Sequence, residues 1–319
     1  MRALDTRLRF LLADGIGGCL RILRILPMKA QGQLRSKAMN YRLGLYEKSM
    51  PSGLEWREML AAGRDAGFDQ LEISIDETDA RLARLDWTQA ERLALLKTEN
   101  ELQMPIRTMC LSGHRKYPLG SHDPAIRARG MDILRKAILF AADMGIRIIQ
   151  LAGYDVYYEA GDADTRAWFA ENLKSGVDFA AKYGVMLGFE TMETPFMDNI
   201  SKAMRYVREI ESPYLGVYPD LGNLTNACEL YGDSVHTEIH AGNAHLFAMH
   251  LKETVPGKYR DMDFGAGRVD FASGIREAYA CGVRLFTAEF WHDGCTDWQN
   301  RLKNTNDFLR NQFKAAGVE

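Results

Sequence analysis

The chain has 319 residues, of which 46% are hydrophobic and 26% charged, proportions typical of a globular protein with one large core. Its formal net charge of −3 excludes a general electrostatic attraction to nucleic acid, and we expect no nucleic-acid partner. The five cysteines are odd in number and include no Cys-x-x-Cys pair, which indicates reduced thiols and favours a cytoplasmic location.

Residues 1–38 differ from the rest of the chain, because arginines are dispersed among leucines, isoleucines and glycines. The longest stretch there without a basic residue, Phe10 to Leu20, contains Asp14 and is too short to span a bilayer, so we expect no membrane partner. The positive start followed by an apolar stretch resembles a weak signal peptide, but no small-x-small cleavage site follows it. We expect residues 1–38 to be an extension outside the fold and residues 39–319 to form one domain. A surface helix or a targeting sequence is the alternative for the first segment.

From Tyr41 onward, the chain repeats eight times a unit of a short β-rich run, a loop and an amphipathic helical stretch. The predicted strands are 42–46, 70–75, 106–111, 146–151, 186–190, 215–220, 246–251 and 285–289. This alternation predicts a parallel α/β sheet, and eight units over about 280 residues match a (β/α)₈ TIM barrel. An open, doubly wound sheet is the alternative, although no Gly-x-Gly-x-x-Gly follows the first strand.

The predicted helices carry start and stop signals in the expected places. Thr88 with Glu91 forms a capping box, and Asp123 followed by proline is a helix N-cap. Glycines precede four of the predicted strands, where a helix ends in a left-handed conformation: Gly67, Gly145, Gly184 and Gly282.

Four consecutive predicted strands each end on, or close to, a metal-ligand residue: Glu190, Asp220, His250 and Glu289. Taken singly, such a carboxylate is more often a helix cap or an ion-pair partner, and such a histidine is more often a hydrogen-bonded core residue. In a barrel, however, corresponding strand ends meet at one mouth, where the chemistry is placed. Three carboxylates and one imidazole suit one divalent metal ion such as Mn²⁺, Zn²⁺ or Mg²⁺.

Several segments resemble one family closely: Arg42–Glu47, Ile73–Asp79, Met109–Arg115, Gln150–Tyr158 and Tyr218–Asn223. They are similar to the L-ribulose-5-phosphate (L-xylulose-5-phosphate) 3-epimerases, which are xylose-isomerase-like TIM barrels. The resemblance runs from about Tyr41 to the C-terminus. The N-terminal extension and a somewhat longer loop from Thr225 to His240 fall outside the pattern.

The resemblance implies the same four metal ligands, and it implies that Glu190 and Glu289 are also the catalytic residues. It implies interconversion of L-ribulose 5-phosphate and L-xylulose 5-phosphate through an enediolate. One base removes the proton on C3, next to the C2 ketone, and the other returns a proton to the opposite face. The expected partner is a small sugar phosphate, and a homodimer is expected from the same resemblance.

The predicted substrate-binding residues lie in or beside the mouth loops: Glu72, His114, Arg115, Lys252 and Arg268. The basic groups are candidates for the phosphate, although charged loop residues are usually only solvated. Glu72 is expected either to contact substrate hydroxyls or to brace the metal ligands.

Three other functions remain open on the sequence alone. A related hexulose-6-phosphate isomerase or inosose dehydratase would use the same metal barrel. A nuclease resembling endonuclease IV would need more histidine ligands and a basic groove, and a non-catalytic sensor would not need two glutamates at one metal. The pair His236 and His240 has zinc-protease spacing, but Thr237 stands where that motif needs glutamate, so we interpret the pair as a surface feature.

Overall fold

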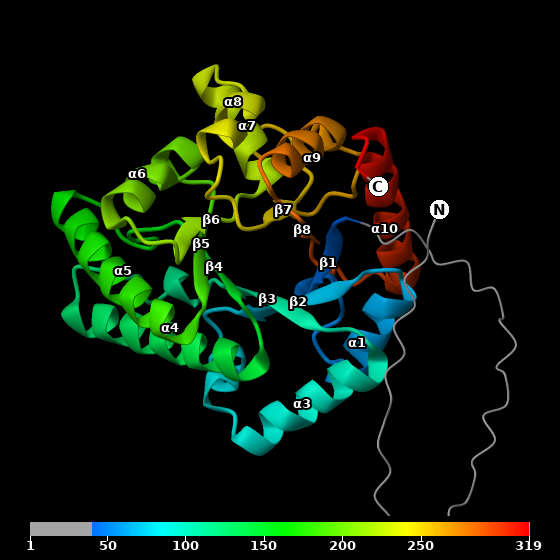
Figure 1. Ribbon diagram of the computed structural model, residues 1–319, viewed down its shortest axis with the longest axis horizontal. Helices are drawn as coiled ribbons and strands as arrows, with labels where there is room; N and C mark the ends of the chain where they lie inside the picture. Colours follow the sequence, from blue (N-terminus) through cyan, green and yellow to red (C-terminus); the bar gives the residue numbers. More distant parts are fainter. Residues whose placement is uncertain (1–39, 319) are drawn as a thin grey trace, which may run out of the picture. The chain divides into compact units, whose positions relative to one another are not determined.

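The structure, a computed structural model, describes residues 40–318, so the expectation for residues 1–38 lies outside the described residues. Eight parallel strands pair in the order β6-β5-β4-β3-β2-β1-β8-β7. Bridges from Val217 to Leu246 and from Asp220 to His250 join β6 to β7. The sheet therefore curls round on itself as a barrel (Figure 1), which confirms the predicted class and removes the open-sheet alternative.

Four strands have the predicted bounds and the other four are shorter. The strands are β1 (Arg42–Tyr46), β2 (Gln70–Ile75), β3 (Ile106–Leu111), β4 (Ile148–Ala152), β5 (Met186–Glu190), β6 (Leu215–Val217), β7 (Met249–Leu251) and β8 (Leu285–Ala288). The sixth and seventh are short because they meet through single bridges rather than a continuous ladder.

Helices surround the strands in Figure 1. They are α1 (Trp56–Asp65), α2 (Asp79–Leu82), α3 (Gln89–Leu102), α4 (Pro124–Met144), α5 (Ala163–Tyr183), α6 (Ile200–Ile210), α7 (Leu221–Tyr231), α8 (Val235–Ala241), α9 (Phe271–Ala280) and α10 (Trp298–Ala315). The capping box of Thr88 and the N-cap Asp123 are present as predicted. The four predicted stop glycines all have positive φ, from 65° at Gly184 to 97° at Gly282.

The two faces of the strands differ in chemistry. Outward-facing residues such as Leu43 and Ile73 are fully buried in a large apolar core that includes residues of the surrounding helices. The barrel interior is apolar at one level, where Ile148, Tyr218 and Ala248 pack together. Buried polar side chains also occur along the strands, among them Glu72, Ser74, Gln150, His250 and Thr287. Burying so many polar groups is costly unless they are paired, which directs attention to what they bind.

None of the helices in residues 40–318 is long and apolar enough to cross a membrane.

Candidate metal centre and active site

The four predicted ligands come together in the structure. Each of them, Glu190, Asp220, His250 and Glu289, offers one ligand atom, and these atoms lie within 4.8 Å of one another. All four residues are buried, none more than 5% exposed. Glu190 ends β5, His250 lies in β7, and Glu289 directly follows β8, so the parallel strands deliver them to one level of the barrel.

Asp220 has two roles, one for each carboxylate oxygen. It is the N-cap of α7, where Oδ1 accepts a hydrogen bond of 2.6 Å from the backbone N–H of Asn223. The other oxygen, Oδ2, is buried and has no hydrogen-bond partner within the part of the chain that the structure describes. A buried carboxylate oxygen without a donor costs free energy, so the cluster fits a cation at this point.

His250 is oriented by groups deeper in the barrel. Its Nε2 lies 2.6 Å from Glu72 Oε1, and the hydroxyl of Tyr218 donates to Glu72 Oε2 at 2.8 Å. Because a carboxylate only accepts, Nε2–H donates to Glu72, which leaves Nδ1 facing Glu289 Oε2 at 3.2 Å and Glu190 Oε1 at 4.0 Å. This carboxylate–imidazole arrangement is typical of histidines that bind metals.

Glu72 is therefore placed as a brace for His250. Its side chain is fully buried, and it does not line the cavity above the cluster. Of the two roles expected for Glu72, the geometry supports the brace.

The surroundings shift the pKa values of Glu190 and Glu289 in opposite directions. Burial, reinforced by the charge of Glu289, raises the pKa of Glu190 to about 8. Burial also acts on Glu289, but Lys252 and His250 outweigh it and hold the pKa of Glu289 well below its ordinary value. Burial raises the pKa of Asp220 to about 6 against the opposing charge of Lys252. Pairs of carboxyl groups with separated pKa values are common where acid and base roles are divided.

Lys252 is part of the cluster rather than of a solvated loop. Its Nζ lies 3.3 Å from Asp220 Oδ1 and 3.4 Å from Glu289 Oε2, and the residue is only 6% exposed. It lines the cavity and neutralises part of the carboxylate charge.

A cavity of about 480 Å³ opens above Glu190 and Glu289, and both glutamates line it. Arg115 also lines it, with its guanidinium 4.9 Å from the ring centre of Tyr157. The loop after β7 contributes Lys258 and Arg260 to the same wall. A small polar ligand with an anionic group would meet carboxylates at the base and cations at the rim.

Two other predicted substrate-binding residues lie elsewhere. His114 is 3% exposed, its Nε2 is 3.2 Å from the backbone oxygen of Gly130, and it does not line the cavity. Burial lowers its pKa to about 4, which favours the neutral imidazole at pH 7. Arg268 forms an ion pair with Glu229 and donates to Asn226, beside a neighbouring cavity. Both contact protein partners, and neither lines the cavity above the glutamates.

Sequence reasoning missed several residues that the structure brings to the site, among them Gln150 and Arg260. Gln150 Nε2 lies 3.0 Å from His250 Nδ1, and Arg260 stands on the cavity wall, with its guanidinium 4.8 Å from the ring centre of Trp291. A glutamine inside the apolar run from Ile148 to Leu151 was a signal for the first. Nothing in the sequence marked Arg260 as a site residue apart from its position in a loop that follows a predicted strand.

A larger cavity, of about 800 Å³, lies at the other end of the barrel and is lined by strand-start residues such as Arg42, Gln70 and Leu285. TIM barrels place their chemistry at the carboxyl ends of the strands, so the smaller cavity is the candidate active site.

Comparisons with known proteins agree with this geometry. The family described as xylose isomerase-like TIM barrel matches residues 60–312. The chain is 43% identical over 279 residues to L-ribulose-5-phosphate 3-epimerase UlaE of Salmonella paratyphi C, an alignment that covers 86% of this chain and 96% of that one.

Solved structures share the fold at low identity. A D-psicose 3-epimerase crystallised in the presence of D-fructose superposes with a TM-score of 0.70 at 16% identity, over 86% of this chain and 99% of that chain. An L-ribulose 3-epimerase superposes with a TM-score of 0.67 at 19% identity, over 87% of this chain and 96% of that chain. The chain therefore belongs to the xylose isomerase-like TIM-barrel family and, within it, to the L-ribulose-5-phosphate 3-epimerases, which are carbohydrate isomerases.

Proposed function

We propose that this chain interconverts L-ribulose 5-phosphate and L-xylulose 5-phosphate by moving the proton on C3. One divalent metal ion, Mn²⁺, Zn²⁺ or Mg²⁺, would be held by the four buried ligands Glu190, Asp220, His250 and Glu289. The observation that carries the proposal is the pair Glu190 and Glu289, which line one cavity from β5 and from the end of β8.

Epimerisation at C3 needs two proton-transfer groups on opposite faces of one carbon. In the strand order, β6 and β7 stand between β5 and β8, and the two glutamates flank Nδ1 of His250. A ketose whose C3 lies between them would present one face to Glu190 and the other to Glu289. One glutamate removes the proton and the other delivers a proton to the opposite face, and the reverse reaction exchanges their roles.

The bound cation would supply charge stabilisation for the oxygen on C2 as the C3 proton leaves. The remaining work belongs to the protein. Glu72 fixes the ring of His250, Lys252 holds Asp220 and Glu289 in place, and a ketose that fills the cavity would displace water from the two bases.

The phosphate would bind at the cationic rim. Arg115, Lys258 and Arg260 line the cavity wall above the glutamates, and guanidinium groups suit phosphate because they donate two parallel hydrogen bonds. Of the basic groups predicted from the sequence, Arg115 keeps this role and Lys252 serves the cluster instead.

Proton exchange tests the proposal directly. L-xylulose 5-phosphate is incubated with the Mn²⁺-loaded protein in D₂O and followed by NMR. Deuterium should enter at C3 while L-ribulose 5-phosphate appears, and both signals should disappear in Glu190→Gln, in Glu289→Gln and after chelation. Glu99→Gln is the matched control, because Glu99 is also a buried glutamate but lies on α3.

Two outcomes would contradict the proposal. Deuterium at C1 would identify an aldose–ketose isomerase, the main alternative, in which C1 and C2 exchange the proton. No exchange at any carbon would exclude carbon-acid chemistry on this substrate.

A homodimer and a cytoplasmic location also stay predictions, which light scattering and cell fractionation can test.

A further inference from the structure

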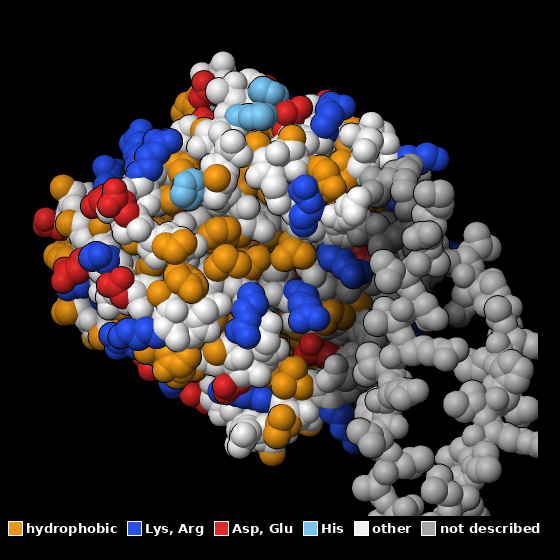
Figure 2. Space-filling view, in the orientation of Figure 1, with side chains coloured by type: hydrophobic (Ala, Val, Ile, Leu, Met, Phe, Trp, Pro, Cys, Tyr) orange, Lys and Arg blue, Asp and Glu red, His pale blue; other side chains and the backbone are white. Residues whose placement is uncertain are grey.

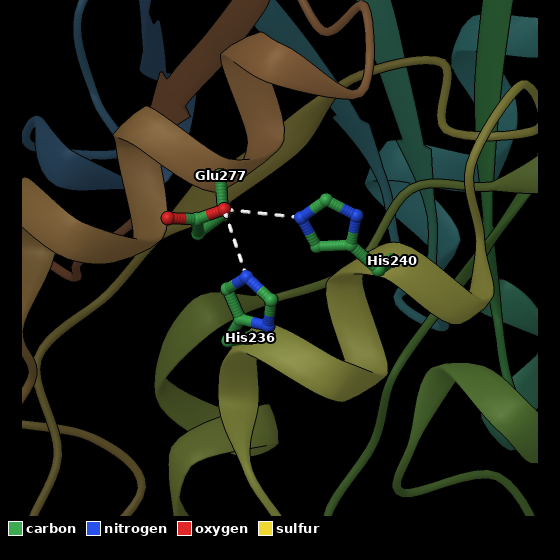
Figure 3. Close-up of side chains that lie close together, drawn as sticks. All are labelled: His236, His240 and Glu277. Atoms are coloured by element: carbon green, nitrogen blue, oxygen red, sulfur yellow. Dashed lines mark hydrogen bonds and ion pairs between the residues drawn. The ribbon is translucent and has the colours of Figure 1, made fainter.

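Two histidines and one glutamate meet on the outer ring of the barrel, away from the active site. His236 and His240 are one turn apart on α8, so they project from the same side of that helix. Glu277 reaches them from α9 (Figure 3). Figure 2 shows histidine side chains exposed over the position of α8, next to acidic and basic groups.

The three side chains converge on one point. Glu277 Oε2 lies 3.3 Å from His236 Nε2 and 3.0 Å from His240 Nε2. The two imidazole rings stack with their centres 4.4 Å apart and their planes 28° from parallel. Both Nε2 atoms face the same carboxylate (Figure 3). Ligand atoms about 2.0–2.2 Å from a tetrahedral zinc ion stand roughly 3.4 Å apart. The two oxygen–nitrogen separations here are close to that value, and all three ligand atoms lie within 4.8 Å of one another.

We propose that His236, His240 and Glu277 form a surface binding site for Zn²⁺ or a similar transition-metal ion. Two imidazoles and one carboxylate make a softer ligand set than the three carboxylates and one imidazole at the barrel mouth, and they leave a fourth position for water. The site is open to solvent, since the side chains of His236 and His240 are 60% and 43% exposed.

The site would join two neighbouring elements of the barrel. α8 precedes β7 and α9 precedes β8. An ion bound by both helices would therefore cross-link the two helix–strand units whose strands carry His250 and lead into Glu289. Thr237 occupies the position where a zinc-protease motif carries its general base. The site therefore fits a structural clip rather than a hydrolytic centre.

Zinc titration of the untagged full-length protein tests the proposal. Isothermal titration calorimetry with ZnCl₂ should show one binding site fewer in His240→Gln than in wild type, and Glu277→Gln should bind Zn²⁺ at this site at least tenfold more weakly. His122→Gln is the matched control, because His122 is also exposed and also bonded to carboxylates, Glu159 at 2.8 Å and Asp162 at 3.0 Å. That variant should keep every site of the wild type.

The readout is a difference between two proteins, so it does not depend on whether the barrel mouth binds zinc. Circular dichroism without added metal should be the same for all variants, which separates loss of a ligand from loss of the fold. Equal numbers of sites and equal affinities in wild type and His240→Gln would overturn the proposal and leave the cluster as an ion pair. Loss of a site in His122→Gln as well would overturn it too, since the binding would then be general to surface histidines.

Discussion

Replacing Glu72 with glutamine separates its two expected roles. In the structure its carboxylate is fully buried, accepts from His250 Nε2 at 2.6 Å and from the Tyr218 hydroxyl at 2.8 Å, and stands outside the cavity lining. Glutamine keeps the shape but removes the charge and one acceptor oxygen. The histidine would then lose a charge-assisted hydrogen bond that fixes its ring and raises the basicity of its other nitrogen.

The expected loss of metal affinity follows from the usual effect of a carboxylate that is hydrogen-bonded to the second nitrogen of a metal-binding histidine. Losing such a partner weakens metal binding by about 10- to 100-fold, which corresponds to roughly 1.4–2.8 kcal/mol of binding free energy. The loss should fall on the metal rather than on the ketose, because His250 lies between Glu72 and the cluster. At saturating metal, most of the activity should return.

The assay is epimerase activity of Glu72→Gln measured against the concentration of Mn²⁺, at several ketose concentrations. We expect the half-activating Mn²⁺ concentration to rise and the KM for the ketose to stay near that of the wild type. Tyr218→Phe removes the second bond to Glu72 and should show a smaller shift in the same direction. A raised KM with an unchanged Mn²⁺ dependence would refute this reasoning and place Glu72 against the substrate.

Three further predictions concern stability. Burial lowers the pKa of His114 to about 4. The neutral imidazole therefore contributes stability that is fully present above pH 6.5, the pKa of an unfolded histidine, and that is lost as the pH falls from there through 4. The stability gap between wild type and His114→Gln, from urea unfolding, should therefore shrink by about 2 kcal/mol between pH 7 and pH 5, and a constant gap would contradict this. Gly130→Ala should lower the free energy of unfolding by about 1–3 kcal/mol despite better helix propensity, because an added Cβ would overlap the Tyr117 carbonyl oxygen; Gly53→Ala, in open space, should be near neutral. Mn²⁺ at about 100 times its Kd should raise the free energy of unfolding by about 2.7 kcal/mol, and Asp220→Asn should reduce this gain.

The barrel and its ligand cluster were predictable because both follow from periodicity. Parallel strands place their carboxyl ends at one edge, so ligand types at the ends of four successive runs had to meet, whatever the loops did. The helix stops were equally local, since Gly145 and Gly184 need a positive φ that glycine adopts without strain. Asp220 fits both predictions for a carboxylate at a strand end, the helix cap and the candidate metal ligand. One of its oxygens caps α7, and the other is buried without a hydrogen-bond partner among the described residues.

The roles of the surrounding polar residues were not predictable, because they depend on which partner a side chain finds in three dimensions. His114 and Arg268 stand near the mouth in sequence, but the backbone of Gly130 and the carboxylate of Glu229 bind them first. Lys252 looks like any loop lysine in the sequence, yet two buried carboxylates bind it. Such choices depend on distances of a few ångströms between elements far apart in the chain.

The charges of the barrel mouth indicate what a cation would add to the proposed two-base site. Glu72, Glu190, Asp220 and Glu289 are four buried carboxylates, and among residues 40–318 the buried groups paired with them that can carry positive charge are Lys252 and His250. Burial and this excess of negative charge together hold the pKa of Glu190 near 8. At neutral pH, Glu190 would then keep its proton while Glu289 is ionised, so the site would rest with Glu289 as the base and Glu190 as the proton donor. With a divalent cation among the ligands, and His250 neutral, three positive charges face four negative ones. The pKa of Glu190 would then fall towards that of Glu289, so that either glutamate could be the ionised base while the other carries the proton that it delivers to the opposite face.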